Sequence, residues 1–418
     1  MSLALPKDKI KGIMKDCHRI LNNPYVSVRT LSRLIGKLSA SIQAVFPAPL
    51  HYQSLLRAKN VALRQSQSYE VMVSLNQAAQ EELHWWKDHL AAWNGKSLLK
   101  RKEDLTIETD ASNLGWGAAC SGMLTGGVWS QQERFQHINC LELMAGGFAV
   151  KSFCKNKASI QVKLLMDNTT AITYINKMGG PSPVLASLVY EIWQWCLQKN
   201  IHLSAHHIPG VLNTSADQES RVDRDAADWK LNPIIFATLN RLWGPLDIDL
   251  FATRLTNQLP RFVSWRPDPE AEATDAFSID WSIVKGYAFP PFNLVGRCLS
   301  QVNSQKVHRL CLVTPVWETQ PWYPVLLEMS VDFPCLFPKG AWVLNKGEMP
   351  HPIAHLQLAG WLISANSTCQ WEFQNKLKTC LSPLGATRPL SHTSQPGTCG
   401  VAGVINKKLM PFQPLCNK

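Results

Sequence analysis

No apolar run in the 418-residue sequence reaches the roughly 18 residues that a membrane-spanning helix needs. The opening segment, MSLALPKDKIKG, reaches Pro and Lys before a leader-like apolar stretch can develop. We therefore expect neither membrane insertion nor secretion by a cleaved leader. The 12 Cys form no C-x-x-C pair and no Cys/His cluster at zinc spacing, so we interpret them as reduced thiols of an intracellular protein, nuclear or cytoplasmic.

The sequence also has no internal repeat of roughly 20 to 50 residues, which argues against a solenoid. The sequence does contain enough apolar residues for folded domains: 45% of residues are hydrophobic and 16 are Trp, which excludes a largely disordered chain. At about 150 residues per domain, this length predicts two or three domains. Changes of pattern place their bounds at 1–100, 101–230 and 231–381, followed by a tail at 382–418.

Positive charge is concentrated at the start of the chain. Residues 1–100 carry 14 Lys and Arg against 6 Asp and Glu, whereas residues 101–230 carry 12 against 13 and residues 231–418 carry 16 against 12. Phosphate contacts provide most sequence-independent affinity for nucleic acids, so this excess favours a nucleic-acid-binding segment. The alternative is a solvated basic surface without function.

The first hundred residues are predicted to be helical. Apolar residues recur at three- and four-residue spacing over 26–46 and again over 78–93, which is typical of amphipathic helices. Arg29, Arg33 and Lys37 are expected on or beside the polar face of the first of these helices. This segment is therefore the candidate for contacting phosphates.

Residues 101–230 carry an α/β pattern. Short alternating runs predict a meander of three strands at 105–110, 115–120 and 126–130. A helix (138–154), a strand (161–167), two helices (169–177 and 182–200) and a strand (201–208) follow. The predicted order is βββαβααβ, a mixed sheet.

The pattern weakens beyond residue 231. Strand-like runs at 247–252, 286–292 and 308–317 are separated by Pro-rich loops and predict a second, small α/β domain. Residues 382–418 begin with a stretch rich in Ser, Thr, Pro and Gly, which predicts a disordered tail.

Four acidic residues occupy recurring structural places in the βββαβααβ segment. Asp110 and Asp167 end two predicted strands, Glu142 lies in a helix, and Asp217 follows the last strand; the intervals are 32, 25 and 50 residues. If the two strands are neighbours, both Asp carboxylates meet at one end of the sheet, and a helix can bring Glu142 beside them. Clustered carboxylates repel unless divalent cations neutralise them, and hard oxygen ligands suit Mg²⁺ or Mn²⁺. Two such ions can activate a water and stabilise the leaving oxygen of a phosphodiester.

Four motifs carry a family resemblance. They are TDASNLGWGAA, NCLELMA, LLMDNTTAITYINK and HIPGVLNTSADQESR, and they resemble the acidic motifs of ribonuclease H domains attached to reverse transcriptases, most of all those of DIRS-type, tyrosine-recombinase retrotransposons. A single Asp at a strand end is usually a cap or turn residue, but four in order at such intervals are specific. The resemblance implies a ribonuclease H-like fold for residues 101–230. It also implies that Asp110, Glu142, Asp167 and Asp217 are the catalytic metal ligands for two Mg²⁺ or Mn²⁺ ions, and that the substrate is an RNA–DNA hybrid.

Two histidines are candidates for proton transfer. His206 and His207 precede Asp217 by 11 and 10 residues, where the resemblance places a His that assists proton transfer or product release, and we assign the role to His207. The alternative is a strand in which one imidazole points into the core and the other to solvent.

Ser112, Asn168 and Asn213 are candidates for contacting the hybrid. Ser112 and Asn168 have an equally good explanation as turn residues, and Asn213 as the cap of the helix that carries Asp217. Gly115 and Gly117 are expected to permit close strand packing.

The flanking regions extend the resemblance. Residues 1–100 are similar to the thumb and connection that join a reverse transcriptase palm to its ribonuclease H, yet no Tyr-x-Asp-Asp-like polymerase motif occurs, so we expect no DNA synthesis. Residues 231–381 are similar to a module related to phage N6-adenine methyltransferases. Its expected Asp/Asn-Pro-Pro-aromatic loop is replaced by FPPF, in which Phe289 offers no acceptor for an amine, and no glycine-rich loop for S-adenosylmethionine is present. We therefore expect an inactive module in which FPPF is a structural turn.

Two hypotheses follow. The first is a metal-dependent endonuclease that cleaves the RNA strand of RNA–DNA hybrids, encoded by a truncated, retrotransposon-derived reading frame without polymerase activity. The second is a non-catalytic nucleic-acid-binding relic of a transposon. The intact set of four acids favours the enzyme, because drift would be expected to erode it.

Overall fold

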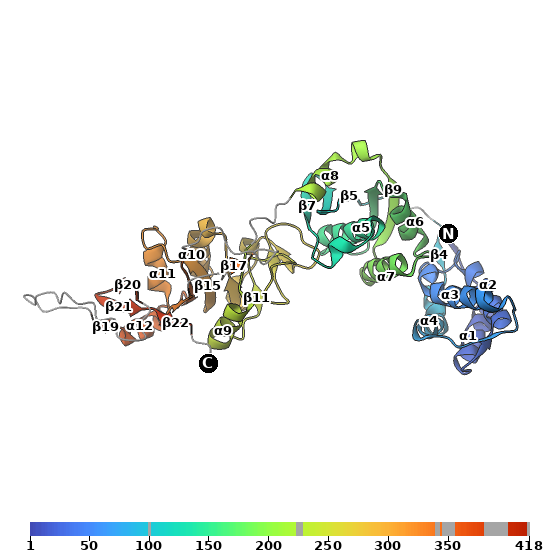
Figure 1. Cartoon of the computed structure of the whole chain (residues 1–418), viewed down its shortest axis with the longest axis horizontal. Helices are drawn as coiled ribbons and strands as arrows, with labels where there is room; N and C mark the ends of the chain where they lie inside the picture. Colours follow the sequence, from blue (N-terminus) through green and yellow to red (C-terminus); the bar gives the residue numbers. More distant parts are fainter. Residues whose placement is uncertain (99–101, 223–228, 339–342, 345–355, 380–399, 416–418) are drawn as a thin grey trace, which may run out of the picture. The chain divides into compact units, whose positions relative to one another are not determined.

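The computed structural model describes the chain except for residues 99–101, 223–228, 339–342, 345–355, 380–399 and 416–418 (Figure 1). The chain forms two compact units, Met1–Val222 and Asp223–Lys418. The finer division into four segments stays a prediction. No helix among the described residues is both long and apolar enough to cross a membrane.

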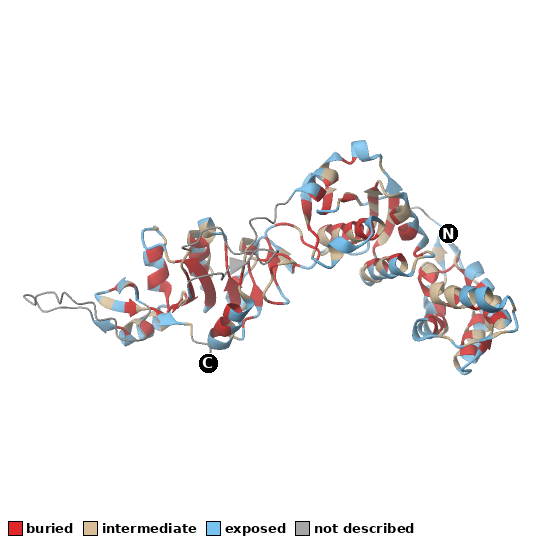
Figure 2. Ribbon diagram, in the orientation of Figure 1, coloured by how far each residue is buried: buried red, intermediate tan, exposed pale blue. Residues whose placement is uncertain are grey.

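The first unit begins with four helices, α1 (Lys7–Leu21), α2 (Val28–Ser41), α3 (Gln53–Ser66) and α4 (Gln77–Trp93). Their apolar stripes form one cluster of buried residues that includes Leu31, Leu38, Leu83 and Trp86 (Figure 2). Side-chain caps start two of these helices, because Ser27 accepts a hydrogen bond from the amide of Thr30 and Asn76 accepts one from the amide of Ala79. The helical pattern expected for residues 1–100 is thus confirmed.

The basic residues of α2 are exposed, but two of the three have acidic partners. Arg29 pairs with Glu70 at 2.6 Å and Lys37 pairs with Asp16 at 2.5 Å. Because these charges are neutralised locally, α2 is a weaker candidate for binding phosphates than its net charge suggests.

The second part of this unit is a five-stranded sheet with the order β7-β6-β5-β8-β9. The strands are β5 (Leu105–Ala111), β6 (Gly115–Cys120), β7 (Met123–Val128), β8 (Gln161–Met166) and β9 (His202–His207). The β5, β6 and β7 strands form an antiparallel meander, whereas β8 is parallel to both β5 and β9. The mixed sheet therefore has the predicted topology.

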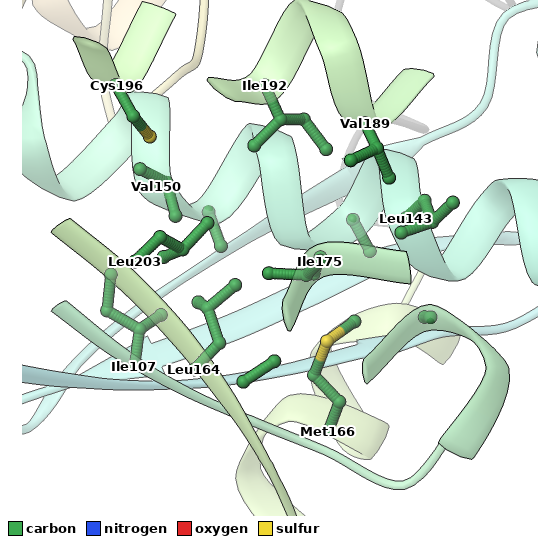
Figure 3. Packing of buried hydrophobic residues seen from close by; sticks show 14 of the residues in the cluster. Ile107, Leu143, Val150, Leu164, Met166, Ile175, Val189, Ile192, Cys196 and Leu203 are labelled. Atoms are coloured by element: carbon green, nitrogen blue, oxygen red, sulfur yellow. The ribbon is translucent and has the colours of Figure 1, made fainter. Parts of the chain in front are cut away.

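The sheet part of this unit also contains four helices: α5 (Ile138–Cys154), α6 (Thr169–Lys177), α7 (Pro183–Gln198) and α8 (Thr214–Arg221). Figure 1 shows α5 and α8 on opposite sides of the sheet, and both pack against β6. In the core, Val150 of α5 and Ile192 of α7 lie above strand residues that include Leu164 and Leu203 (Figure 3). The predicted order βββαβααβ, and with it the ribonuclease H-like fold class, is confirmed.

Aromatic contacts join the helical part to this sheet part. Phe46 packs edge-on against Trp193 of α7 at 5.6 Å, and His51 contacts Tyr190 of the same helix at 5.9 Å. The two parts belong to one compact unit, although each has its own buried cluster.

The second unit is also α/β, as predicted. Its six-stranded sheet has the order β11-β14-β15-β18-β16-β22, in which β11, β14 and β15 are parallel. These strands are β11 (Ile248–Asp249), β14 (Gly286–Ala288), β15 (Leu310–Pro315), β18 (Leu358–Ile363), β16 (Cys335–Leu336) and β22 (Gln413–Pro414). The main helices are α9 (Pro233–Trp243), α10 (Val295–Ser304), α11 (Tyr323–Met329) and α12 (Ser367–Lys376).

The expectation of a disordered tail at 382–418 is wrong for residues 400–415. These residues include β20 (Val401–Ile405) and β21 (Lys408–Pro411), which pair with each other, and β21 also pairs with β19 (Lys378–Thr379). The reason is burial, since Ala402, Met410 and Phe412 belong to the core of this unit. The Ser/Thr/Pro/Gly-rich stretch itself falls largely in 380–399, outside the described residues.

Candidate functional site

Three of the predicted acids meet at one end of the five-stranded sheet. Asp110 is the next-to-last residue of β5 and Asp167 directly follows β8, the parallel neighbour of β5. Glu142 projects from the first half of α5, which packs against β5. One carboxylate oxygen from each of Asp110, Glu142 and Asp167 lies within 4.8 Å of the other two.

The electrostatics of this cluster are unfavourable without a cation. Glu142 is 4% exposed, and burial, reinforced by the charges of Asp110 and Asp167, raises its pKa to about 9. Its Oε2 atom is buried and, among the described residues, has no hydrogen-bond partner. Burial also raises the pKa of Asp110, and the charges of Asp167 and Asp217 add to that effect. A hard divalent cation would satisfy these oxygens and neutralise their charge, so the donor set fits Mg²⁺ or Mn²⁺.

Asp217, the fourth predicted ligand, lies outside this cluster of three. Its Oδ1 atom accepts from Arg221, at 2.6 Å from Nη2 and 2.8 Å from Nε. Both residues belong to α8, one helical turn apart. The positions of Asp217 and Arg221 fit the i,i+4 charge pattern of a helix, a signal that the sequence contains.

Two glycines let α8 approach the sheet. A Cβ on Gly117 would lie 2.2 Å from the carbonyl oxygen of Ala216 and 2.5 Å from the amide nitrogen of Ser220, and one on Gly126 would lie 3.2 Å from the carbonyl oxygen of Glu219. Gly115 has the predicted role, because its Cβ would collide with Gly127 of the neighbouring strand. Gly117 instead makes room for the helix that carries Asp217.

Ser220 is a site residue that sequence reasoning missed. Its hydroxyl oxygen lies 2.9 Å from Oδ2 of Asp110 and 2.9 Å from the carbonyl oxygen of Asp217, and the side chain is buried. This hydrogen bond lowers the pKa of Asp110 and so opposes the effect of burial. Its only signal in the sequence is its place three residues after Asp217.

The predicted substrate-binding residues have structural partners. Ser112 accepts from the amides of Leu114 and Gly115 in the β5–β6 turn, and its hydroxyl donates to the carbonyl oxygen of Ser220. Asn213 is fully buried and its amide donates to the carbonyl oxygen of Thr109, so the structure does not bring it to the surface of the site. Although Asn213 stands at the N-cap position of α8, its side chain makes no cap bond.

Asn168 caps α6, because its side-chain oxygen accepts from the amide of Ala171. Its amide group donates to the side-chain oxygen of Asn139, which lies three residues before Glu142 on α5. Asn168 and Asn139 are both partly exposed. Asn139 is thus a second polar neighbour of the cluster that sequence reasoning missed.

Both histidines are exposed at the end of β9. His207 stands opposite Met166, the residue before Asp167, in the parallel pair of β9 and β8. The alternative, in which one imidazole points into the core, is therefore not found, and the proton-transfer role of His207 stays a prediction. The loop after β9 passes close to the cluster, since a Cβ on Gly210 would lie 3.3 Å from Oδ2 of Asp167.

A basic groove of about 830 Å³ lies between α3 and the end of α6 in the same unit. Its cationic lining residues are Arg57, Arg64, Lys96 and Lys177. In the part of the chain that the structure describes, no ion pair joins any of the four to a carboxylate. The groove thus brings together four cationic side chains that the described residues do not pair with a carboxylate, whereas on α2 two of the three are paired.

The chain matches no protein-family model and no curated protein. Solved structures with similarity include the N-terminal RNase H domain of a Mycobacterium tuberculosis protein, 20% identical over 30% of this chain and 95% of that chain, with a TM-score of 0.25. RNase H1 from the archaeon Halobacterium salinarum is 17% identical over 29% of this chain and 98% of its own, also with a TM-score of 0.25. A foamy viral protease–reverse transcriptase, solved in complex with an RNA/DNA hybrid, is 11% identical over 48% of this chain and 27% of its own, with a TM-score of 0.20. At this level of likeness, the function of the chain has to be inferred from its own residues.

Proposed function

We propose that the chain is a metal-dependent endonuclease that cleaves the RNA strand of RNA–DNA hybrids. The observation that carries this proposal is the meeting of Asp110, Glu142 and Asp167 within 4.8 Å at the end of parallel strands, with one buried oxygen of Glu142 lacking a partner among the described residues. Three carboxyl groups at this spacing must either repel one another or stay protonated, and a bound cation would remove that cost.

Asp110, Glu142 and Asp167 would hold the metal, and we propose two ions, Mg²⁺ or Mn²⁺. When bound, these ions supply activation of a water and neutralisation of charge on the scissile phosphodiester. Asp217 is proposed as the fourth ligand. His207, exposed at the end of β9, is proposed to move a proton at its imidazole during cleavage or product release.

Nucleic-acid binding is supported by the basic groove. Its Arg57, Arg64, Lys96 and Lys177 form a cationic surface on the same compact unit that contains the acidic cluster. Such a surface can bind the phosphates of a hybrid without reading its sequence. We further propose a DIRS-type retrotransposon origin, without polymerase activity, on the motifs quoted above.

One observation favours the second candidate function, a non-catalytic nucleic-acid-binding protein. Asp217 is held in an ion pair with Arg221 and lies outside the cluster. The test is cleavage of an end-labelled RNA–DNA hybrid by the full chain in Mg²⁺ or Mn²⁺, with duplex DNA and a chelator as controls. Metal-dependent cleavage confined to the RNA strand supports the enzyme, whereas hybrid binding without cleavage in either metal supports the alternative.

A further inference from the structure

The fourth acid of the site has a cationic partner on its own helix. Arg221 contacts Oδ1 of Asp217 through both Nη2 and Nε, at 2.6 and 2.8 Å. The Asp217 side chain is 38% exposed and that of Arg221 is 64% exposed. An ion pair this accessible to water is weak and can be exchanged for another partner.

Asp217 is close to the cluster although its carboxylate is not part of it. Ser220 connects the two, because its hydroxyl oxygen lies 2.9 Å from both Oδ2 of Asp110 and the backbone carbonyl of Asp217. A reorientation of the Asp217 side chain is therefore the change that would be needed to bring a fourth carboxylate toward Asp110.

The backbone of α8 has little freedom to make that movement instead. The helix sits directly on Gly117, where a Cβ would lie 2.2 Å from the carbonyl oxygen of Ala216, and close to Gly126, where a Cβ would lie 3.2 Å from that of Glu219. Interiors packed at this density do not yield by small displacements. The Asp217 carboxylate can therefore contact either Arg221 or a cation bound at the cluster.

We propose that Arg221 holds Asp217 away from the cluster of Asp110, Glu142 and Asp167 and so competes with a divalent cation for the Asp217 carboxylate. The proposal rests on the proposed function, because it needs a metal at the cluster. Arg221 is then a positioning residue that sets the metal concentration at which all four carboxylates assemble. Because the pair is exposed, salt screens it, and the competition weakens as ionic strength rises.

The test measures the binding of Mn²⁺ alone to the full chain, by calorimetric titration without nucleic acid. Arg221→Gln removes the competing charge and is expected to tighten Mn²⁺ binding about two- to fivefold, the range of an exposed ion pair. Arg221→Lys keeps the charge and should stay near the parent. Arg19→Gln is the matched control, because Arg19 is 59% exposed and pairs with Asp16 on its own helix, α1.

A second variant, Asp217→Asn, distinguishes competition for the Asp217 carboxylate from a general effect of the Arg221 charge on metal binding. In Asp217→Asn there is no carboxylate to compete for, so adding Arg221→Gln should leave the Mn²⁺ affinity unchanged. An equal gain in that background, or no gain in Arg221→Gln alone, overturns the proposal. Circular dichroism checks that each variant is folded.

Failure of the proposed function has a different signature. If the parent chain binds no Mn²⁺, the metal site is wrong and the role of Arg221 is wrong with it. If the parent binds Mn²⁺ and cleaves a hybrid but Arg221→Gln does not tighten binding, only the role of Arg221 is wrong.

Discussion

Each unit of the chain buries a carboxylate near the end of a strand, and the two are stabilised differently. Asp249 of β11 is 2% exposed and both of its oxygens accept backbone amides, Oδ1 from Phe251 at 3.3 Å and Oδ2 from Gln258 at 3.1 Å. Burial raises its pKa to about 7 even though these bonds lower it. The structure thus provides Asp249 with the donors it needs.

The cluster of the first unit lacks such donors. Glu142 is buried nearly as deeply as Asp249, but its neighbours are two more carboxylates, and its pKa is raised to about 9. Burial and a raised pKa therefore do not by themselves indicate a metal site. The distinguishing property is the Glu142 oxygen, for which the described residues provide no donor, and this points to a ligand from outside the chain.

The largest expected effect is the loss of cleavage when an acid of the cluster is substituted. Asp110→Asn or Asp167→Asn removes a charged ligand while nearly preserving shape, so hybrid cleavage should fall by orders of magnitude with the fold intact. Asp249→Asn is the control and should leave the rate per folded molecule unchanged. The measurement is the cleavage rate of a labelled hybrid in Mn²⁺. Asn variants that cleave as fast as the parent would show that the metal-site assignment is wrong.

The second expected effect is a change in the free energy of unfolding, and its sign is opposite for substitutions of Glu142 and Asp249. Without metal, Glu142→Gln removes an acid that must stay protonated or repel its neighbours, and should raise the free energy of unfolding by about 1–3 kcal/mol. Asp249→Asn leaves a backbone amide facing a donor and should lower it by about 1–3 kcal/mol. Urea unfolding in chelator at pH 8 measures both changes. A loss of stability in Glu142→Gln would contradict the view that the cluster is strained without a cation.

The pH dependence of stability separates the same two residues. A carboxyl group whose pKa is raised by folding binds its proton more tightly in the folded state, so its stabilising contribution is complete below the ordinary pKa and is lost as the pH rises to the raised one. For Asp249 this window runs from 3.8 to about 7, and for Glu142 from 4.5 to about 9. Between pH 7 and 9, the metal-free chain should therefore lose about 1 kcal/mol per pH unit through Glu142.

Urea unfolding in chelator at several pH values checks this slope. Glu142→Gln should remove most of it between pH 7 and 9, whereas Asp249→Asn should keep it. If the slope survives in Glu142→Gln, another group titrates in that range and the pKa of Glu142 is lower than burial suggests.

Much of the first unit could be predicted from its sequence, because the signals are local. Periodicity identifies β5, β8 and α5, and the positions of Asp110 and Asp167 at strand ends bring them together once the two strands are neighbours, as the structure shows them to be. The position of the Asp217 carboxylate could not be predicted in the same way. It depends on which partner the side chain takes, and the i,i+4 spacing of Asp217 and Arg221 permits their ion pair without excluding contact with the cluster.

The last described residues of the chain show a different limit of prediction from sequence. Residues 400–415 contain a local hairpin, β20 and β21, but their last strand, β22, pairs with β16 (Cys335–Leu336), far away in sequence, so no local pattern indicates that pairing. Ala402 and Met410 are buried there, although the Ser/Thr/Pro/Gly-rich composition before them indicates disorder. Composition therefore describes its own stretch and not the strands that follow it.

The smallest expected effect concerns Ser220, the side-chain donor that the described part of the chain provides to the cluster. Ser220 offers Asp110 a hydroxyl where Asp249 receives backbone amides. Ser220→Ala removes this donor but leaves every carboxylate in place, so Asp110 stays a ligand but is less well oriented. We expect the cleavage rate to fall about tenfold, the lower end of the range for one hydrogen bond to a charged group. Ser300→Ala is the control, because that hydroxyl contacts only the backbone of its own helix, at Gly296. A rate equal to the parent would show that Asp110 needs no donor, and a loss as large as that of Asp110→Asn would show that Ser220 takes a direct part in the chemistry.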